Sequence, residues 1–185
     1  KVSKAHRRFG TTSLLPTVIS DELDLMREMA RSVERAIELN IQGVRGIHFE
    51  GPFLNPERKG VHNARFMHQK EADFLSILDE FELGAILVTL APEKVSPGFI
   101  KDLHGRGIKI SAGHSAATYD QIREATRHGL SGFTHLYNAM TPTTAREPGI
   151  VGAALELQQC FSGIIADGHH VHKTVLKQAL TALTA

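Results

Sequence analysis

The sequence predicts an α/β fold built around a parallel sheet. Hydrophobic runs of strand length alternate with amphipathic segments of helix length along the 185 residues. This alternation is typical of strand–helix–strand units with right-handed crossovers. The residues that could act in catalysis or bind a metal follow the strand runs, as the catalytic face of a barrel requires. No Gly-x-Gly-x-x-Gly sequence follows the first strand run, which weakens a dinucleotide-binding interpretation.

The first half of the chain is expected to contain three helices and three strands. The helices are predicted at residues 2–9, 21–39 and 71–81, and the strands at 11–19, around Ile47 and at 85–92. The helix at 21–39 has the plainest pattern, because its apolar residues recur at steps of three and four. Ser20 is expected to cap this helix, and the two acidic residues that follow suit its positive end.

The second half continues the alternation. Helices are predicted at residues 97–105, 118–128 and 173–183, and strands at 108–111, 132–136 and 161–167. Pro97 suits the first turn of a helix, and Gly129 suits a helix end. The chain is therefore interpreted as six strand-plus-helix units. Such units form either an open doubly wound sheet or most of an eight-stranded barrel, and the pattern alone does not decide between them.

The composition excludes several classes of partner. The formal net charge is +1, with 22% charged and 42% hydrophobic residues, so neither nucleic acid nor a membrane surface is an expected partner. No apolar run approaches the ~20 residues that span a bilayer, and no signal peptide is visible. Cys160 is the single cysteine, which excludes an intrachain disulfide and favours a cytoplasmic location and a buried structural thiol.

Three candidate metal ligands, Glu50, His114 and His135, each follow a short hydrophobic run. Each residue taken alone is most simply a loop residue. One carboxylate and two imidazoles at successive strand ends can nevertheless converge on one point, as in the metal sites of parallel barrels. Three protein ligands leave a position open for water, which is the mark of a catalytic rather than a structural site.

The motifs around these residues resemble those of the N-acetylglucosamine-6-phosphate deacetylase family, which belongs to the amidohydrolase superfamily. The motifs occur in the family's order and span nearly the whole chain. They are HFEGPF at 48–53, KGVH at 59–62, SAGHSAAT at 111–118, THLYNAM at 134–140, REPG at 146–149 and IADGHH at 165–170. Each motif is weak alone, but the combination is specific.

The resemblance implies a TIM-type (β/α)8 barrel, of which residues 1–185 form units two to seven. It makes Glu50, His114 and His135 the ligands of one divalent ion, with zinc expected and iron, manganese or cobalt as alternatives. It implies that the acetamide of N-acetylglucosamine 6-phosphate is hydrolysed to glucosamine 6-phosphate and acetate. The positions that match the family's substrate-binding residues are Val61, His62, Asn138, Ala139, Arg146, Asp167 and His170.

Two parts of the family's pattern fall outside the sequence. The small β-sandwich domain is absent, and the position of the catalytic aspartate lies beyond Ala185, so the 185-residue chain alone is expected to be inactive. A homodimer is implied for the full-length protein. Two alternatives stay open: another amidohydrolase acting on a cyclic amide or nucleobase, and a non-catalytic remnant that binds a sugar phosphate.

Overall fold

The computed structural model describes residues 2–67 and 69–184, and the chain divides into two compact units. The first unit holds residues 2–52, 62–67 and 69–88, and the second holds 53–61 and 89–184. Six strands follow one another in the order β1-β2-β3-β4-β5-β6. The pairings β1–β2, β4–β5 and β5–β6 are parallel, as the predicted crossovers require. The α/β class is therefore confirmed.

The first unit contains helices α1, α2 and α3, and the strands that they connect. Its elements are α1 (Val2–Arg7), β1 (Thr17–Ile19), α2 (Leu23–Glu38), β2 (Gly46–Glu50), a short 3-10 turn (Ala64–Phe66), α3 (Glu71–Glu80) and most of β3 (Ala85–Leu90). The register of β1 on β2 pairs Ile19 with Glu50, which places Glu50 at the carboxyl end of its strand.

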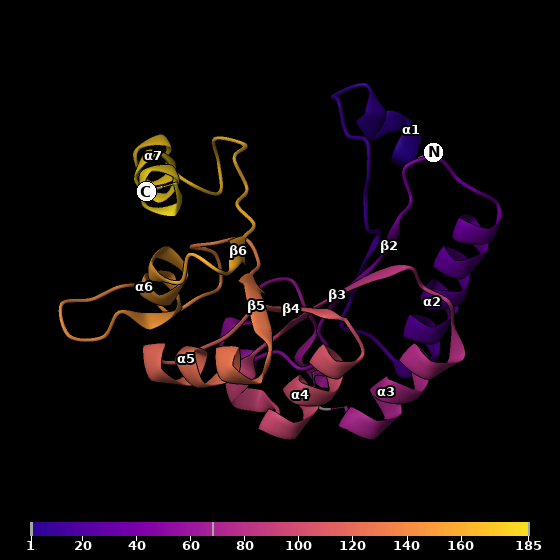
Figure 1. The fold of residues 1–185 in the computed structure, drawn as a ribbon, viewed down its shortest axis with the longest axis horizontal. Coiled ribbons are helices and arrows are strands. Elements are labelled where there is room, and N and C mark those ends of the chain that lie inside the picture. Colours follow the sequence, from indigo (N-terminus) through magenta and orange to yellow (C-terminus); the bar gives the residue numbers. More distant parts are fainter. Residues whose placement is uncertain (1, 68, 185) are drawn as a thin grey trace. The chain divides into compact units, whose positions relative to one another are not determined.

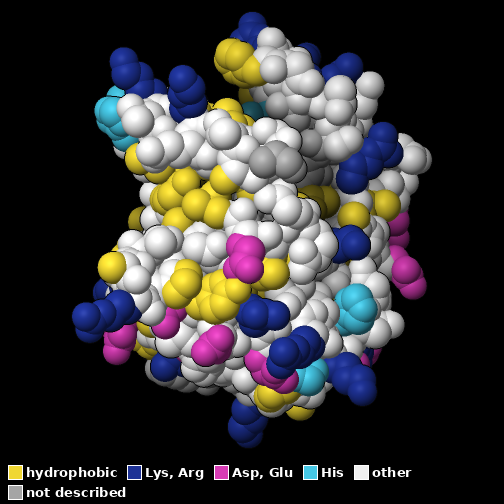
Figure 2. Space-filling model, turned by 60° about the vertical axis from the view of Figure 1, so that its left-hand side comes forward, with side chains coloured by type: hydrophobic (Ala, Val, Ile, Leu, Met, Phe, Trp, Pro, Cys, Tyr) yellow, Lys and Arg dark blue, Asp and Glu magenta, His cyan; other side chains and the backbone are white. Residues whose placement is uncertain are grey.

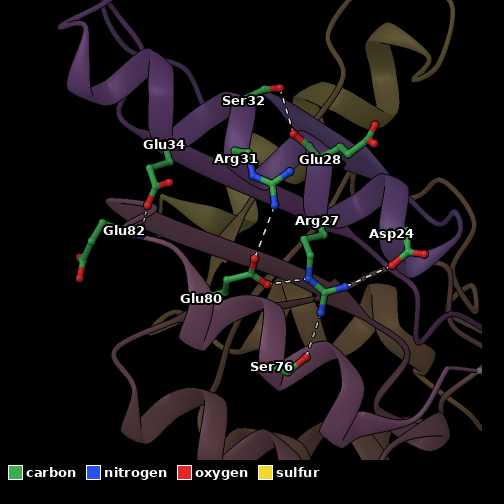
Figure 3. A network of polar contacts seen from close by, with 9 residues as sticks. All are labelled: Asp24, Arg27, Glu28, Arg31, Ser32, Glu34, Ser76, Glu80 and Glu82. Atoms are coloured by element: carbon green, nitrogen blue, oxygen red, sulfur yellow. Dashed lines mark hydrogen bonds and ion pairs between the residues drawn. The ribbon is translucent and has the colours of Figure 1, made fainter.

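Helices α2 and α3 are joined on their outer side by ion pairs. Nε of Arg27 lies 2.6 Å from a carboxylate oxygen of Glu80, and the same guanidinium reaches Asp24 and Ser76 (Figure 3). Arg31 also lies within 3.6 Å of Glu80. The inner side is apolar, and the Phe74 side chain of α3 is fully buried. The two helices are therefore amphipathic, with a charged contact at the solvent side.

The second unit carries the remaining elements. They are a 3-10 turn (Pro56–Arg58), the end of β3, a second turn (Pro92–Lys94), α4 (Pro97–Gly105), β4 (Lys109–Ala112), α5 (Tyr119–His128), β5 (Leu130–Phe133), α6 (Gly149–Glu156), β6 (Phe161–Ser162) and α7 (Lys173–Leu183). Helices α4 and α5 lie side by side (Figure 1). Each of the six strands is followed by a helix, so the six predicted units are present.

Local signals explain the helix ends of this unit. The hydroxyl of Ser96 accepts a hydrogen bond from the backbone N–H of Phe99, and Pro97 occupies the first turn of α4. Thr118 and Gln121 form a capping box at the start of α5. Gly129 ends α5 in the left-handed region, with φ +119°.

Helix α6 is not among the helices predicted from the sequence. Its sequence is GIVGAALE, with two glycines, no charged residue before the last position and five buried residues. A helix that is buried on most sides has no polar stripe, so it lacks the 3.6-residue pattern that marks an amphipathic helix. Only its packing in the second unit makes it helical.

The structure corrects the prediction for Ser20. The N-cap of α2 is Glu22, which makes no side-chain capping bond. Ser20 is 2% exposed, and its hydroxyl lies 3.1 Å from Nδ1 of His62. The Ser20 hydroxyl therefore contacts the buried ring of His62 instead of capping α2.

Three predicted strands are also shorter than expected. Strand β1 covers three residues, β5 ends at Phe133, and β6 covers two residues. The residues before β1 and after β6 are partly or fully exposed and lie outside the paired strands, so the hydrophobic runs there are longer than the ladders. The end of β5 matters for function, since it leaves His135 in the turn that follows.

Charged side chains are spread over the surface shown in Figure 2, and the single cysteine lies inside. On the face drawn in Figure 2, lysine and arginine side chains are spread over the whole face, whereas the acidic side chains lie mostly in its lower half. Cys160 is buried, and burial raises the pKa of its thiol. Within the described residues, no helix is both long and apolar enough to cross a membrane.

Candidate metal and substrate site

The first candidate ligand, His114, lies just beyond strand β4. The strand ends at Ala112, and the backbone of Gly113 then passes close to Thr89. A Cβ at position 113 would lie only 2.7 Å from the Thr89 methyl group, so glycine is required there. His114 then adopts the left-handed region at φ +47° and is 6% exposed. The N–H of Asn55 donates to its carbonyl oxygen at 2.8 Å. A non-glycine residue in this region is strained and is held there by its surroundings.

The second candidate ligand, His135, occupies the corresponding place after β5. It lies two residues past Phe133 and also has a positive φ, +38°. The next residues turn sharply, with Tyr137 and Ala139 in the left-handed region as well. The N–H of Asn138 donates to the carbonyl oxygen of His135 at 2.9 Å, which closes the turn.

The two imidazoles face one another. Nε2 of His135 lies 3.0 Å from Nε2 of His114, and the ring planes cross at 86°. Nδ1 of His114 lies 2.8 Å from the carbonyl oxygen of Arg58. A carbonyl oxygen can only accept, so Nδ1 of His114 carries the hydrogen. In the neutral ring, the lone pair of Nε2 therefore points toward His135.

This arrangement fits a divalent cation. Metal-bound histidines donate their second ring nitrogen to a carbonyl or carboxylate, as His114 does to Arg58. Two imidazole nitrogens at close range are also a donor pair that suits zinc and its neighbours in the periodic table. His114 and His135 could thus hold an ion together, with Nε2 of each ring as the ligand atom.

A chain of hydroxyl groups supports the strand ends beneath the two histidines. The hydroxyl of Thr134 lies 2.6 Å from that of Thr89 and donates to that of Ser111 at 2.7 Å. Thr89 and Ser111 are fully buried. These hydrogen-bonded hydroxyl groups connect β3, β4 and the residue before His135, and so they fix the spacing of these strand ends.

The third candidate ligand, Glu50, ends strand β2 in the first unit. Its Oε2 lies 3.8 Å from Nε2 of His62, whose side chain is almost fully buried. The N–H of Ser20 donates to Nδ1 of His62 at 3.3 Å, so Nδ1 is the acceptor and the neutral ring carries its hydrogen on Nε2. His62 thus directs an N–H toward the Glu50 carboxylate.

The turn after His135 holds two of the predicted substrate-binding residues. The amide nitrogen of Asn138 donates to the carbonyl oxygens of His135 and Leu136, each at 3.4 Å. The carbonyl oxygen of Ala139 accepts from the N–H of Ser115 at 3.2 Å. Asn138 and Ala139 therefore connect the turn of one histidine to the residue after the other.

The remaining predicted positions are more exposed. Val61 is 90% exposed, and Arg146 is an exposed arginine in the loop before α6. The Asp167 carboxylate accepts from the N–H groups of His169 and His170, and its second oxygen lies 2.7 Å from Nδ1 of His170. These bonds, led by the backbone N–H of His170, hold the pKa of Asp167 well below its ordinary value.

Three groups around His114 were not among the predicted site residues. They are the carbonyl of Arg58, the side chain of Asn55 and the carboxylate of Glu93. A carbonyl group carries no signal in a sequence. Glu93 could have been suspected, because it lies just beyond the end of strand β3, but the sequence contains no histidine next to it that would suggest a metal site.

Comparison with known proteins places these features in a class. No protein-family profile matches the chain. Among solved structures, an N-acetylglucosamine-6-phosphate deacetylase from Mycobacterium smegmatis in complex with N-acetyl-D-glucosamine-6-phosphate superimposes with a TM-score of 0.91 and 31% identity, over 97% of this chain and 47% of that one. The deacetylase from Pasteurella multocida gives a TM-score of 0.84 and 35% identity, over 94% and 46%. The fold is accordingly that of the TIM-barrel amidohydrolases.

The particular relatives are amino-sugar-phosphate deacetylases. The N-acetylgalactosamine-6-phosphate deacetylase of a Shewanella species is 48% identical over 91% of this chain and 43% of its own length. The N-acetylglucosamine-6-phosphate deacetylase of Danio rerio is 35% identical over 96% and 46%. The chain is therefore homologous to these deacetylases over most of its length, which confirms the resemblance seen in the motifs. It spans about half the length of the relatives that it matches.

Proposed function

We propose that this chain is part of a metal-dependent deacetylase that removes the acetyl group from an N-acetylhexosamine 6-phosphate. The observation that carries the proposal is the pair of Nε2 atoms of His114 and His135, 3.0 Å apart, with the His114 ring fixed through Nδ1. Homology to deacetylases of N-acetylglucosamine 6-phosphate and N-acetylgalactosamine 6-phosphate supports the reaction.

Glu50, His114 and His135 are the proposed ligands of one divalent ion, which we expect to be zinc. They supply one carboxylate oxygen and two imidazole nitrogens, a donor set that leaves a position open for water. The bound ion would lower the pKa of that water and polarise the acetamide carbonyl. Nε2 of His62 lies 3.8 Å from the Glu50 carboxylate, so the two side chains are close neighbours.

The proposed substrate contacts come from loops that follow the strands. Arg146 is exposed and has a planar guanidinium that matches two phosphate oxygens. The remaining proposed contacts are Val61, His62, Asn138, Ala139, Asp167 and His170. Asp167 also accepts hydrogen bonds from His169 and His170, so it orients His170 as well.

The proposal includes residues outside these 185. We propose that the chain forms units two to seven of the barrel and that a catalytic aspartate beyond Ala185 moves the proton between water and the leaving amine. The relatives' greater length supports this assignment. The full-length protein would be active as a homodimer.

The test compares substrates in the gene product that contains this chain. Hydrolysis of N-acetylglucosamine 6-phosphate is measured beside that of N-acetylglucosamine, with metal added back after chelation. The proposal expects turnover that needs both the phosphate and the metal. Equal turnover of the two sugars would point to another amidohydrolase, and tight binding of the sugar phosphate without turnover would point to a non-catalytic protein.

The C4 epimer is the second candidate substrate. The Shewanella relative, at 48% identity, is named for N-acetylgalactosamine 6-phosphate. The two sugars differ only in the direction of one hydroxyl group, and a site that hydrogen-bonds a hydroxyl can reject its absence or misplacement strongly. The ratio of kcat/KM for the two epimers decides which one the site selects.

A further inference from the structure

Glu93 contacts two segments that position His114: one contains Asn55, and the other contains Ser115 and Ala116. Glu93 lies in the short turn after strand β3, is half-buried, and is not one of the candidate ligands. We propose that Glu93 is a positioning residue for the metal site, acting through His114. The inference rests on the proposed function in so far as His114 binds a metal, but each contact that carries it lies within the second unit.

One set of contacts fixes the backbone that follows His114. The N–H of Ala116 donates to Oε1 of Glu93 at 2.7 Å, and the hydroxyl of Ser115 donates to Oε2 at 2.6 Å. Ser115 is fully buried, and its hydroxyl also accepts from the N–H of Ala117. The carboxylate of Glu93 therefore fixes Ser115 and Ala116, the two residues that follow His114 and its positive φ.

A second contact reaches the segment that orients the ring. The side-chain amide of Asn55 donates to Oε1 of Glu93 at 2.9 Å. The carbonyl of the same side chain accepts from the N–H of Glu57, which starts the 3-10 turn 56–58. That turn ends at Arg58, whose carbonyl accepts from Nδ1 of His114. Glu93 therefore supports the ring of His114 as well as its backbone.

Glu93 accepts hydrogen bonds through both oxygens of its carboxylate. The three donors are the side-chain amide of Asn55, the hydroxyl of Ser115 and the backbone N–H of Ala116. Hydrogen bonds to a charged acceptor are short and about twice as strong as neutral ones. With Glu93 in place, the backbone and ring of His114 are held from two sides. Groups that orient a ligand in this way typically change metal affinity about 10–100-fold when they are removed.

The test measures zinc affinity directly, by competition with a chromophoric chelator, in the gene product that contains this chain after removal of bound metal. Glu93→Ala is expected to weaken zinc binding about 10–100-fold. Nitrogen-15 NMR of the metal-free protein gives a second reading, because the Nδ1–H form of His114 should lose its dominance in the variant. A role in folding alone would lower stability without changing the tautomer of this ring.

Glu147→Ala is the matched control. Glu147 is also a carboxylate of the second unit that accepts two backbone N–H bonds, from Tyr119 and Gly149. Its removal is expected to lower stability and to leave zinc affinity unchanged. Wild-type zinc affinity in Glu93→Ala, or an equal loss in both variants, would overturn the inference.

A milder variant decides the matter if Glu93→Ala does not fold. Ser115→Ala removes one of the three bonds to Glu93, and a measurable loss of zinc affinity in the folded variant is expected; unchanged affinity would reject the inference. Failure of the proposed function is separate, because it appears in the unaltered protein. A wild-type protein that binds no zinc, or whose zinc affinity is unaffected by His114→Ala, contradicts the metal site itself.

Discussion

The carbonyl oxygen of Arg58 accepts a hydrogen bond from Nδ1 of His114 at 2.8 Å, and this contact determines which ring nitrogen faces His135. Arg58 contributes through its backbone, so its side chain can vary without loss of the contact. The left-handed backbone of His114 and the glycine at position 60 both serve this geometry.

Replacing His114 with alanine is expected to lower the metal content of the purified protein at least about ten-fold, because one of the proposed ligands is removed. His128→Ala is the control. His128 lies at the end of α5 and bonds to the exposed carboxylate of Glu124, so its loss should not change metal content. Elemental analysis per chain provides the measurement, and equal metal content in the two variants would contradict the site.

Gly60→Ala is expected to displace the imidazole ring of His114. Gly60 has φ +55°, and a Cβ there would lie 3.1 Å from Cε1 of His114. The strained backbone should cost about 1 kcal/mol of unfolding free energy, and the displaced ring should weaken zinc binding. Gly105→Ala in α4, where no atom lies within 4 Å, should be neutral or slightly stabilising. Chemical denaturation and zinc titration of both variants test this.

The contact between Arg27 and Glu80 should couple helices α2 and α3. Both side chains are partly exposed, at 29% and 40%, so the pair is expected to contribute about 0.2–1 kcal/mol. A double-mutant cycle of Arg27→Ala and Glu80→Ala measures this coupling by urea unfolding. The coupling should shrink in 1 M salt, where charges are screened within about 3 Å. A coupling that is unaffected by salt would show that packing, not charge, links these helices.

Asp167 should make stability depend on pH. Its pKa lies below the ordinary value of 3.8 in the folded chain, so its ionised form stabilises the fold above that value. The contribution is lost as the pH falls through the lower, folded-state pKa. Asp167→Asn should therefore be less stable than wild type at neutral pH, and the difference should vanish in acid. Thermal midpoints measured across the acid range test this, and a difference that is constant with pH would rule it out.

Arg146→Ala should raise the KM for the 6-phosphate substrate about 10–100-fold if Arg146 binds the phosphate, because a hydrogen bond to a charged group contributes about 1.5–3 kcal/mol. Arg146→Lys should recover only part of the loss, since lysine lacks the planar fork. Arg123→Ala is the control, because Arg123 lies over the ring of Tyr119 on α5. Steady-state kinetics with all three variants decide the matter, and an unchanged KM in Arg146→Ala would remove this residue from the site.

Much of the fold could be predicted because its signals are local. Helices α4 and α7 begin and end at the predicted residues, since proline, capping side chains and apolar spacing act within a few positions. The candidate ligands could be placed for the same reason, because Glu50, His114 and His135 each follow a hydrophobic run. The alternation of strands and helices was enough for the parallel α/β class.

The sequence by itself therefore determined the class of fold and the residue types at the strand ends. Only the tertiary structure decided that α6 is a helix, that Ser20 supports His62 instead of capping α2, and that Glu93 clamps the segments around His114. The physical reason is distance along the chain. Ser20 and His62 are 42 residues apart, and Asn55 and Glu93 are 38 apart, so no local pattern encodes their contacts. Burial and hydrogen bonding across the folded chain select these partners.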